Sequence, residues 1–115
     1  MDFTMFAGDT KRLMFSITSG PPANAPLDIS DATVTWQASR GNTTRFSKVP
    51  VLTKTIGNGV EVTDELSGNL TVELLPADTA SLAGTYYHEL QITDAAGDVA
   101  TAFAGEFKVL RNLIP

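Results

Sequence analysis

The chain contains short runs in which apolar and polar residues alternate, separated by residues that favour turns. In residues 11–18, Leu13, Phe15 and Ile17 fall on one side of the alternation. A period of two places successive side chains on opposite faces of a β-strand. The same pattern recurs in six further segments: 32–40, 51–56, 60–66, 69–75, 85–94 and 99–110. The pattern therefore predicts seven or eight short strands.

Stretches rich in glycine, asparagine and proline lie between these segments. Gly57-Asn58-Gly59, Ser67-Gly68-Asn69 and the run from Asp94 to Gly97 predict tight turns. Residues 20–31 hold three prolines, which no helix tolerates in its interior. We therefore interpret 20–31 and the polar stretch 41–50 as loops that face solvent or a partner.

One segment departs from the strand pattern. Pro76 suits the first position of a helix, and Gly84 suits the left-handed residue that ends one. The residues between them support one short helical turn near residues 77–82. Short strands, regular turns and a single helical turn indicate an all-β fold. We expect a single antiparallel, immunoglobulin-like β-sandwich that occupies residues 1–115 as one domain.

His88 is the only histidine in the chain. Alternation places it on the same face of its strand as Tyr86 and Leu90, which is the apolar face. Catalysis would require a carboxylate or nucleophile within hydrogen-bond reach, and the adjacent Glu89 faces the other way. We therefore expect His88 to be a neutral core residue. The sequence does not identify its hydrogen-bond partner.

Tyr86 precedes His88 by two residues, which is the spacing of the tyrosine corner in immunoglobulin-type sandwiches. Its hydroxyl is expected to bond the backbone within residues 77–84. Trp36 occupies an inward strand position, and Phe15 is expected where the first cysteine of such domains lies. Phe15, Trp36 and His88 would together fill the volume that a tryptophan and a disulfide occupy in such domains. The complete predicted core set is Phe15, Trp36, Tyr86, His88, Leu90, Phe103 and Phe107.

The composition excludes several kinds of functional site. The absence of cysteine and the single histidine exclude disulfides, thiolate metal sites and multi-histidine sites. Turn acids such as Asp64 and Asp94 offer oxygen ligands suited to calcium, but they lack EF-hand spacing. No nucleotide-binding or hydrolase motif is present, so we predict no catalytic residue, no metal and no cofactor. No apolar stretch approaches the ~20 residues of a membrane-spanning helix.

The net charge of −5 disfavours general nucleic-acid binding, and the charge is unevenly distributed. Residues 1–54 hold six bases and four acids, whereas residues 55–107 hold nine acids and neither lysine nor arginine. Such a division favours self-assembly through complementary patches. Alternatively, strands from both halves interleave and the two blocks form no separate faces.

Both ends of the chain are apolar, although terminal segments are usually polar and frayed. Such segments dock either on their own sheet edge or on a neighbouring molecule. Two basic residues in the loop 41–50 could meet an acidic partner. The candidate interface residues are Phe3, Met5, Phe6, Leu110, Leu113, Ile114, Arg45 and Lys48.

Five short motifs resemble one protein family. They are Gly8-Asp9-Thr10 before the first long strand, Asp28 to Val34, Leu74 to Thr79, Gly84 to Tyr87 and Thr93 to Gly97. This series resembles the small immunoglobulin-like β-sandwich domain of tailed-phage structural proteins. It is similar to the module that opens the upper baseplate protein of phages that infect lactic-acid bacteria. The helical and carbohydrate-recognition parts of that protein have no counterpart here, so receptor binding does not carry over.

The resemblance implies a non-enzymatic virion building block that is made in the bacterial cytoplasm. Its expected partners are other phage structural proteins and further copies of itself, on the tail, baseplate or neck. The net charge and the lack of a long apolar stretch lead us to expect contact with neither nucleic acid nor membrane. The alternatives are a capsid decoration or head-fibre protein, and a module that binds a host-surface glycan. Position in the virion, copy number and symmetry are not predicted.

Overall fold

The computed structural model describes residues 1–18 and 27–114. Much of the predicted loop 20–31 lies outside the described residues. The described part contains eight strands and one short helix: β1 (Phe3–Phe6), β2 (Lys11–Ser16), β3 (Thr33–Gly41), β4 (Phe46–Ile56), β5 (Gly59–Asp64), β6 (Asn69–Leu74), α1 (Pro76–Thr79), β7 (Gly84–Thr93) and β8 (Val99–Leu110).

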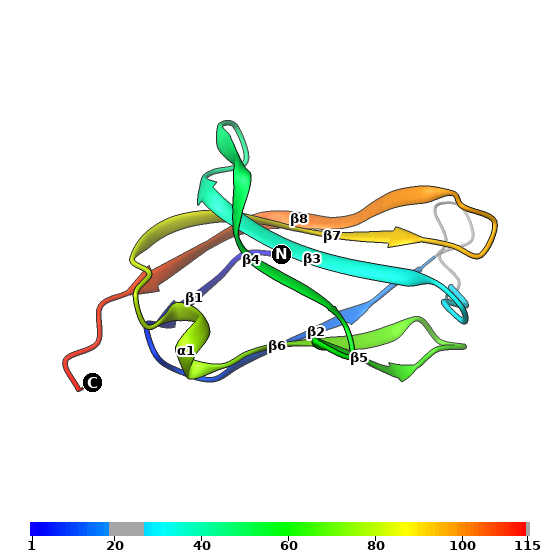
Figure 1. Cartoon of the computed structure of the whole chain (residues 1–115), viewed down its shortest axis with the longest axis horizontal. Coiled ribbons are helices and arrows are strands. Elements are labelled where there is room, and N and C mark those ends of the chain that lie inside the picture. The colour runs from blue at the N-terminus through cyan, green and yellow to red at the C-terminus, as the bar shows by residue number, and fades with distance from the viewer. Residues whose placement is uncertain (19–26, 115) are drawn as a thin grey trace.

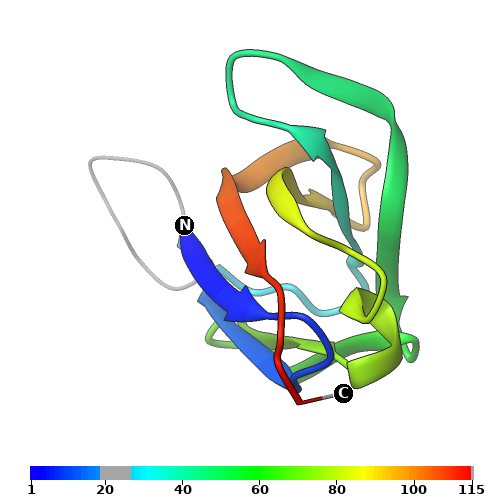
Figure 2. The same cartoon turned by 90° about the vertical axis from the view of Figure 1, so that its left-hand side faces the viewer.

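All eight strands belong to one hydrogen-bonded sheet with the order β1-β8-β7-β3-β4-β5-β6-β2. The sheet folds over on itself, so that β3, β7 and β8 lie above β2, β5 and β6 (Figure 1). Viewed from the end, it forms a nearly closed curve in which β1 lies beside β8 (Figure 2). The prediction of an all-β, immunoglobulin-like sandwich is confirmed.

The expectation of purely antiparallel pairing is wrong for two pairs of strands. The first is β1 with β8, which run parallel with Phe3 opposite Phe107 and Phe6 opposite Leu110. A hairpin forces two strands to be antiparallel, but strands from opposite ends of the chain carry no such constraint. The N-terminal segment is therefore docked on the last strand of its own chain.

The second parallel pair joins β4 to β5 through the predicted turn at residues 57–59. Gly57 and Gly59 adopt positive φ values of 83° and 97°, which glycine tolerates without steric cost. Thr55 pairs with Gly59 in parallel register. The turn therefore shifts the chain sideways and does not reverse its direction. The strand thereby passes from the upper layer into the lower one (Figure 1).

The predicted loop 41–50 is mostly strand. β3 extends to Gly41 and β4 begins at Phe46, which leaves a four-residue turn at 42–45. Two register shifts, on either side of Ser39, make the β3–β4 pairing irregular. This hairpin projects from the body of the molecule (Figure 1). Its polar composition reflects the solvent around the projection and not an absence of strand.

The other predicted turns and the helix are found where the sequence indicated them. The turn at 94–97 is closed by a hydrogen bond from Gly97 N–H to the Asp94 carbonyl, and the β5–β6 hairpin turns at Gly68. α1 is shorter than the predicted 77–82 because its α-helical residues end at Thr79. The Leu75 N–H donates to Asp78 Oδ2, which satisfies a free donor at the start of this helix.

The core lies between the two layers and is built from alternate residues of every long strand. On β6, Leu70, Val72 and Leu74 are buried and the residues between them are half-buried. Trp36 on β3 and Phe107 on β8 fill the centre. Burial of side chains this large stabilises the fold by about 1.5–3 kcal/mol each.

The tyrosine corner predicted at Tyr86 is confirmed. The Tyr86 hydroxyl donates to the Ala83 carbonyl and accepts from the Ala83 N–H, both at 3.1 Å. Ala83 lies within the predicted stretch 77–84. These two bonds fasten the end of the helical segment to the start of β7.

Tyr86→Phe is expected to lower the free energy of unfolding by about 1–3 kcal/mol, because both Ala83 groups lose their partner. Urea denaturation checks this value. Tyr87→Phe is the matched control, since its hydroxyl bonds only the Glu89 side chain at the surface. Equal losses for the two variants would contradict the corner's structural role.

Candidate functional site

His88 lies at the centre of the molecule with no exposed surface. Trp36 Nε1–H donates to His88 Nδ1 at 3.1 Å. On the other side of the ring, His88 Nε2 lies 2.6 Å from the Met1 carbonyl oxygen, and the carbonyl can only accept. Nδ1 is therefore the acceptor and Nε2 carries the proton. This is a neutral imidazole with both nitrogens occupied, an arrangement that leaves no ring atom free for a substrate or metal.

The surroundings of His88 hold its pKa below the ordinary value of 6.5. Burial is the main cause, because it penalises the charged imidazolium. The nearby N-terminal ammonium lowers the pKa further, whereas the hydrogen bond to Met1 and the charge of Asp2 oppose the shift. His88 is therefore neutral at pH 7.

We expect NMR titration of the single imidazole to show a proton on Nε2 at pH 7 and a pKa below 6.5. The unfolded chain protonates His88 near pH 6.5, before the native chain does, so the unfolded state binds more protons just below that pH. The contribution of His88 to stability is thus complete above about pH 6.5 and declines as the pH falls below it. A proton on Nδ1 at pH 7, or a pKa above 6.5, would contradict the assignment.

Aromatic rings surround His88, but not all are those expected. Phe3 and Phe107 contact it edge to face at centroid distances of 5.4 and 5.7 Å, and Trp36 lies at 5.7 Å. Phe15 packs instead against Phe103 at 4.9 Å. Of the predicted core set, Phe103 is only half-buried; the fully or nearly fully buried members are Phe15, Trp36, Tyr86, His88, Leu90 and Phe107.

The N-terminal residues close over this aromatic cluster. The Met1 ammonium donates to the Ala104 carbonyl at 3.0 Å, and Asp2 Oδ1 accepts from the Glu106 N–H at 2.9 Å. Between these contacts lies Gly105, where an added Cβ would overlap the Met1 carbonyl. A glycine at this position lets the first two residues approach β8 closely enough to reach His88.

The candidate interface residues separate into three environments. Met5 is buried and Phe3 is half-buried against His88, so of the two predicted docking modes these residues follow the one on the chain's own sheet edge. The reason is that β1 fills the groove on β8 of its own chain. The exposed apolar candidates are Phe6, Leu110, Leu113 and Ile114. The two basic candidates, Arg45 and Lys48, are exposed on the projecting hairpin.

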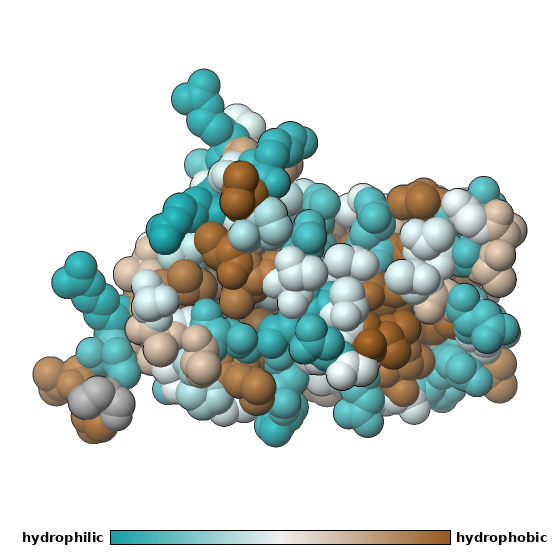
Figure 3. Space-filling model, viewed as in Figure 1, coloured by the Kyte–Doolittle hydropathy of each residue, from teal (hydrophilic) through white to brown (hydrophobic). Residues whose placement is uncertain are grey.

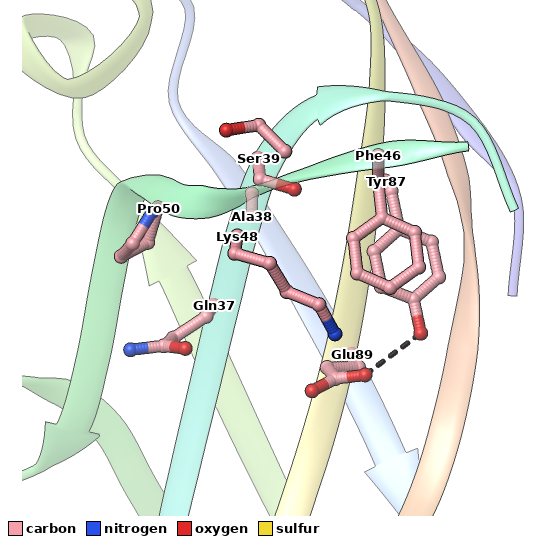
Figure 4. Close-up of a pocket in the computed structure, with 9 residues that line it drawn as sticks. Gln37, Ala38, Ser39, Phe46, Lys48, Pro50, Tyr87 and Glu89 are labelled. Carbon is pink, nitrogen blue, oxygen red and sulfur yellow. Dashed lines mark hydrogen bonds between the residues drawn. The ribbon is translucent and has the colours of Figure 1, made fainter.

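A small surface groove lies at the base of the hairpin (Figure 4). Phe46 and Tyr87 stack at a centroid distance of 4.0 Å, and Lys48 Nζ lies 5.2 Å from the Phe46 ring. The Tyr87 hydroxyl donates to Glu89 Oε2 at 2.7 Å. Partial burial and this carboxylate raise the pKa of Tyr87 to about 12. The groove encloses about 150 Å³ and its polar groups already bond one another in part.

Lys54 on β4 is a buried base, unlike the exposed Arg45 and Lys48. Its ammonium lies 2.8 Å from Asp78 Oδ2, and only 9% of its side chain is exposed. The bridge joins β4 to α1 across the two layers. Sequence alternation gave no sign of this pair, since a lysine in a half-polar strand usually faces solvent.

Within residues 1–18 and 27–114, no group of three or more histidine, cysteine, aspartate or glutamate side chains is placed to hold a metal ion. Asp94 Oδ1 accepts from the Ala96 and Asp98 N–H groups, and Asp64 Oδ1 from Ser67 N–H. These turn acids therefore organise their own turns. In the same described residues, no helix is long and apolar enough to cross a membrane.

Three solved structures are similar to this chain. CopC from Methylosinus trichosporium OB3b has a TM-score of 0.48 and 13% identity, covering 96% of this chain and 84% of that one. Murine CRIg has a TM-score of 0.38 and 10% identity, covering 96% and 92%. AggA, the major subunit of aggregative adherence fimbriae type I from Escherichia coli, has a TM-score of 0.34 and 16% identity, covering 96% and 89%.

No protein-family model matches the chain, and no curated protein sequence matches it. With TM-scores of 0.48 or less and identities of 10–16%, the similar structures carry no argument about this chain.

Proposed function

We propose that this protein is a non-enzymatic structural component of a tailed-phage virion that assembles in multiple copies on the tail, baseplate or neck. The observation that carries the proposal is the apolar segment after β8. Leu113 and Ile114 are 96% and 81% exposed, and the C-terminal end of the described chain extends away from the body (Figures 1 and 3). Apolar side chains displayed in this way favour burial against a neighbouring protein.

The family motifs support the proposal through the structural roles of their residues. Gly8 adopts φ 81° in the β1–β2 connection, and its N–H donates to Thr79 Oγ1 at 3.0 Å. Two of the five motifs therefore meet in space, since Thr79 ends the Leu74–Thr79 motif. The Gly84–Tyr87 motif supplies the tyrosine corner, and Thr93–Gly97 forms the β7–β8 turn. Four of the five motifs therefore build the scaffold, as expected for a family of structural modules.

The chemistry of the described residues favours a structural role over catalysis or glycan binding. The single histidine is fully engaged inside the core, and neither of the two residues considered as a sugar platform, Trp36 and Tyr87, offers a free aromatic face. Trp36 has no exposed surface, and Tyr87 is stacked on Phe46. Sugar-binding platforms require a free aromatic face, so the glycan-binding alternative gains no support.

The proposal is tested in particles of the phage whose genome encodes this chain. We expect mass spectrometry of density-purified particles to find the protein at several copies or more per particle. Gold-labelled antibodies should mark tails, and tail preparations that lack heads should retain the protein. Labelling confined to heads would favour the capsid-decoration alternative. Absence from purified particles would overturn the proposal.

A further inference from the structure

The projecting hairpin is basic, although two carboxylates of the body lie against it: Glu106 contacts Thr43, and Glu89 lines the same groove as Lys48. We call residues 40–50, which span the end of β3, the turn and the start of β4, the hairpin arm. The arm contains three bases, Arg40, Arg45 and Lys48, and no acidic residue. All three are exposed, and the arm rises beyond the surface formed by the rest of the molecule (Figures 1 and 3).

The arm is held in place by hydrogen bonds within its turn and by contacts with β7 and β8. Asn42 Oδ1 accepts from the Thr44 and Arg45 N–H groups at 3.0 and 2.9 Å. Thr43 N–H donates to Glu106 Oε1 at 3.0 Å, which ties the turn to β8. The Phe46–Tyr87 stack fixes the base of the arm on β7. A rigid element of this kind loses little conformational entropy when it binds a partner.

Three turns at the far end of the sandwich carry the opposite charge. We call them the acidic turns: residues 27–32, 64–68 and 94–98. They lie together, because Ile29 N–H donates to the Glu65 carbonyl and Thr33 pairs with Thr93. They contain six acids and no base: Asp28, Asp31, Asp64, Glu65, Asp94 and Asp98, all of them exposed.

The hairpin arm and the acidic turns cannot meet within one molecule. On β3, Arg40 at the arm is seven residues from Thr33 at the acidic turns, or about 23 Å along a strand. That span exceeds the Debye length of about 8–10 Å at moderate salt, so the two patches do not neutralise each other. Each patch is therefore complementary to the other patch on a second molecule.

We propose that the hairpin arm binds the acidic turns of a second copy of this chain, so that copies join head to tail. This inference rests on the proposed multi-copy function. A contact between two different patches is heterologous, and it builds either a closed ring or an open row of subunits. The net charge of −5 makes a nucleic-acid partner for the arm the weaker choice.

Complementary charge reversals test the contact. The arm variant is Arg45→Glu with Lys48→Glu. The turn variant is Glu65→Lys with Asp98→Lys, two acids whose side chains make no hydrogen bond within the described residues. We expect wild-type protein to self-associate at about 50 mM salt in sedimentation equilibrium and to dissociate at about 500 mM salt. Each variant alone should weaken association at least about tenfold, and an equimolar mixture of the two should restore it.

Arg12→Glu with Lys108→Glu is the matched control. It makes the same change of net charge at exposed residues outside the arm, and it should associate like wild type. A monomeric wild type at low salt, or full association of both variants, would overturn the inference. The inference would also be overturned if the arm binds a DNA duplex and the charge reversals leave self-association unchanged.

The two proposals fail in different ways. If the protein is found in particles but both variants enter the particles and self-associate as wild type does, the head-to-tail contact is wrong and the virion function stands. If the protein is missing from particles while the charge-reversed mixture associates, the contact stands and the virion function is wrong.

Discussion

Asp78→Ala is expected to lower the free energy of unfolding by about 3–5 kcal/mol. The change leaves the Lys54 ammonium without a partner in a position where only 9% of the side chain is exposed. It also removes the acceptor for the Leu75 N–H at the start of α1. Urea denaturation at pH 7 measures the loss.

The second salt bridge provides the control. Arg12 Nε lies 2.9 Å from Glu73 Oε2, with side chains 65% and 37% exposed. Glu73→Ala should therefore cost no more than about 1 kcal/mol. The double variant Lys54→Met with Asp78→Ala should recover part of the loss, since it removes the unpaired charge. An Asp78→Ala loss no larger than that of Glu73→Ala would show that burial does not strengthen this pair.

Gly105→Val is expected to release the first residues of the chain and to destabilise the fold by about 1–3 kcal/mol. An added Cβ overlaps the Met1 carbonyl and approaches Asp2 Oδ1. The Met1 contact with His88 is then lost, and water reaches the ring. Hydrogen exchange at residues 3–6 should accelerate, and the pKa of His88 should rise towards 6.5.

Ala104→Val adds the same kind of side chain one residue earlier, at an exposed position on the other face of β8. It should leave both the exchange rates and the His88 titration unchanged. A Gly105→Val protein that keeps slow exchange at residues 3–6 would show that β8 tolerates a side chain beneath Met1. The docking of the N-terminus would then not depend on this glycine.

Alternation and turn chemistry are local properties, and the features that depend on them were predictable. The inward direction of His88 follows from its spacing to Tyr86 and Leu90 on one strand. The tyrosine corner spans only three residues, from Ala83 to Tyr86, so its partner lies within a predicted turn. The positive φ of Gly57 follows from a Gly-Asn-Gly stretch, although the direction of the chain after it does not.

The contacts that define the candidate sites join distant parts of the chain, and alternation does not reveal which strands become neighbours. Met1 and His88 are 87 residues apart, and Lys54 and Asp78 are 24 apart. The Phe46–Tyr87 stack depends on the irregular register of β3 with β4, which no single strand specifies. One signal was available: an aromatic residue within a polar stretch, such as Phe46, indicates a packing partner beyond the stretch.

The parallel pairing of β1 with β8 has a mechanical consequence. If tension acts between the two ends of the chain, it pulls β1 backward from Phe3 and β8 forward from Leu110. The force then runs along the strands and loads all the hydrogen bonds between them in shear. An antiparallel pair pulled from one end would instead unzip one bond at a time. The sandwich is thus built to resist stretching along its length, and the first element to yield would be the pair that its ends form.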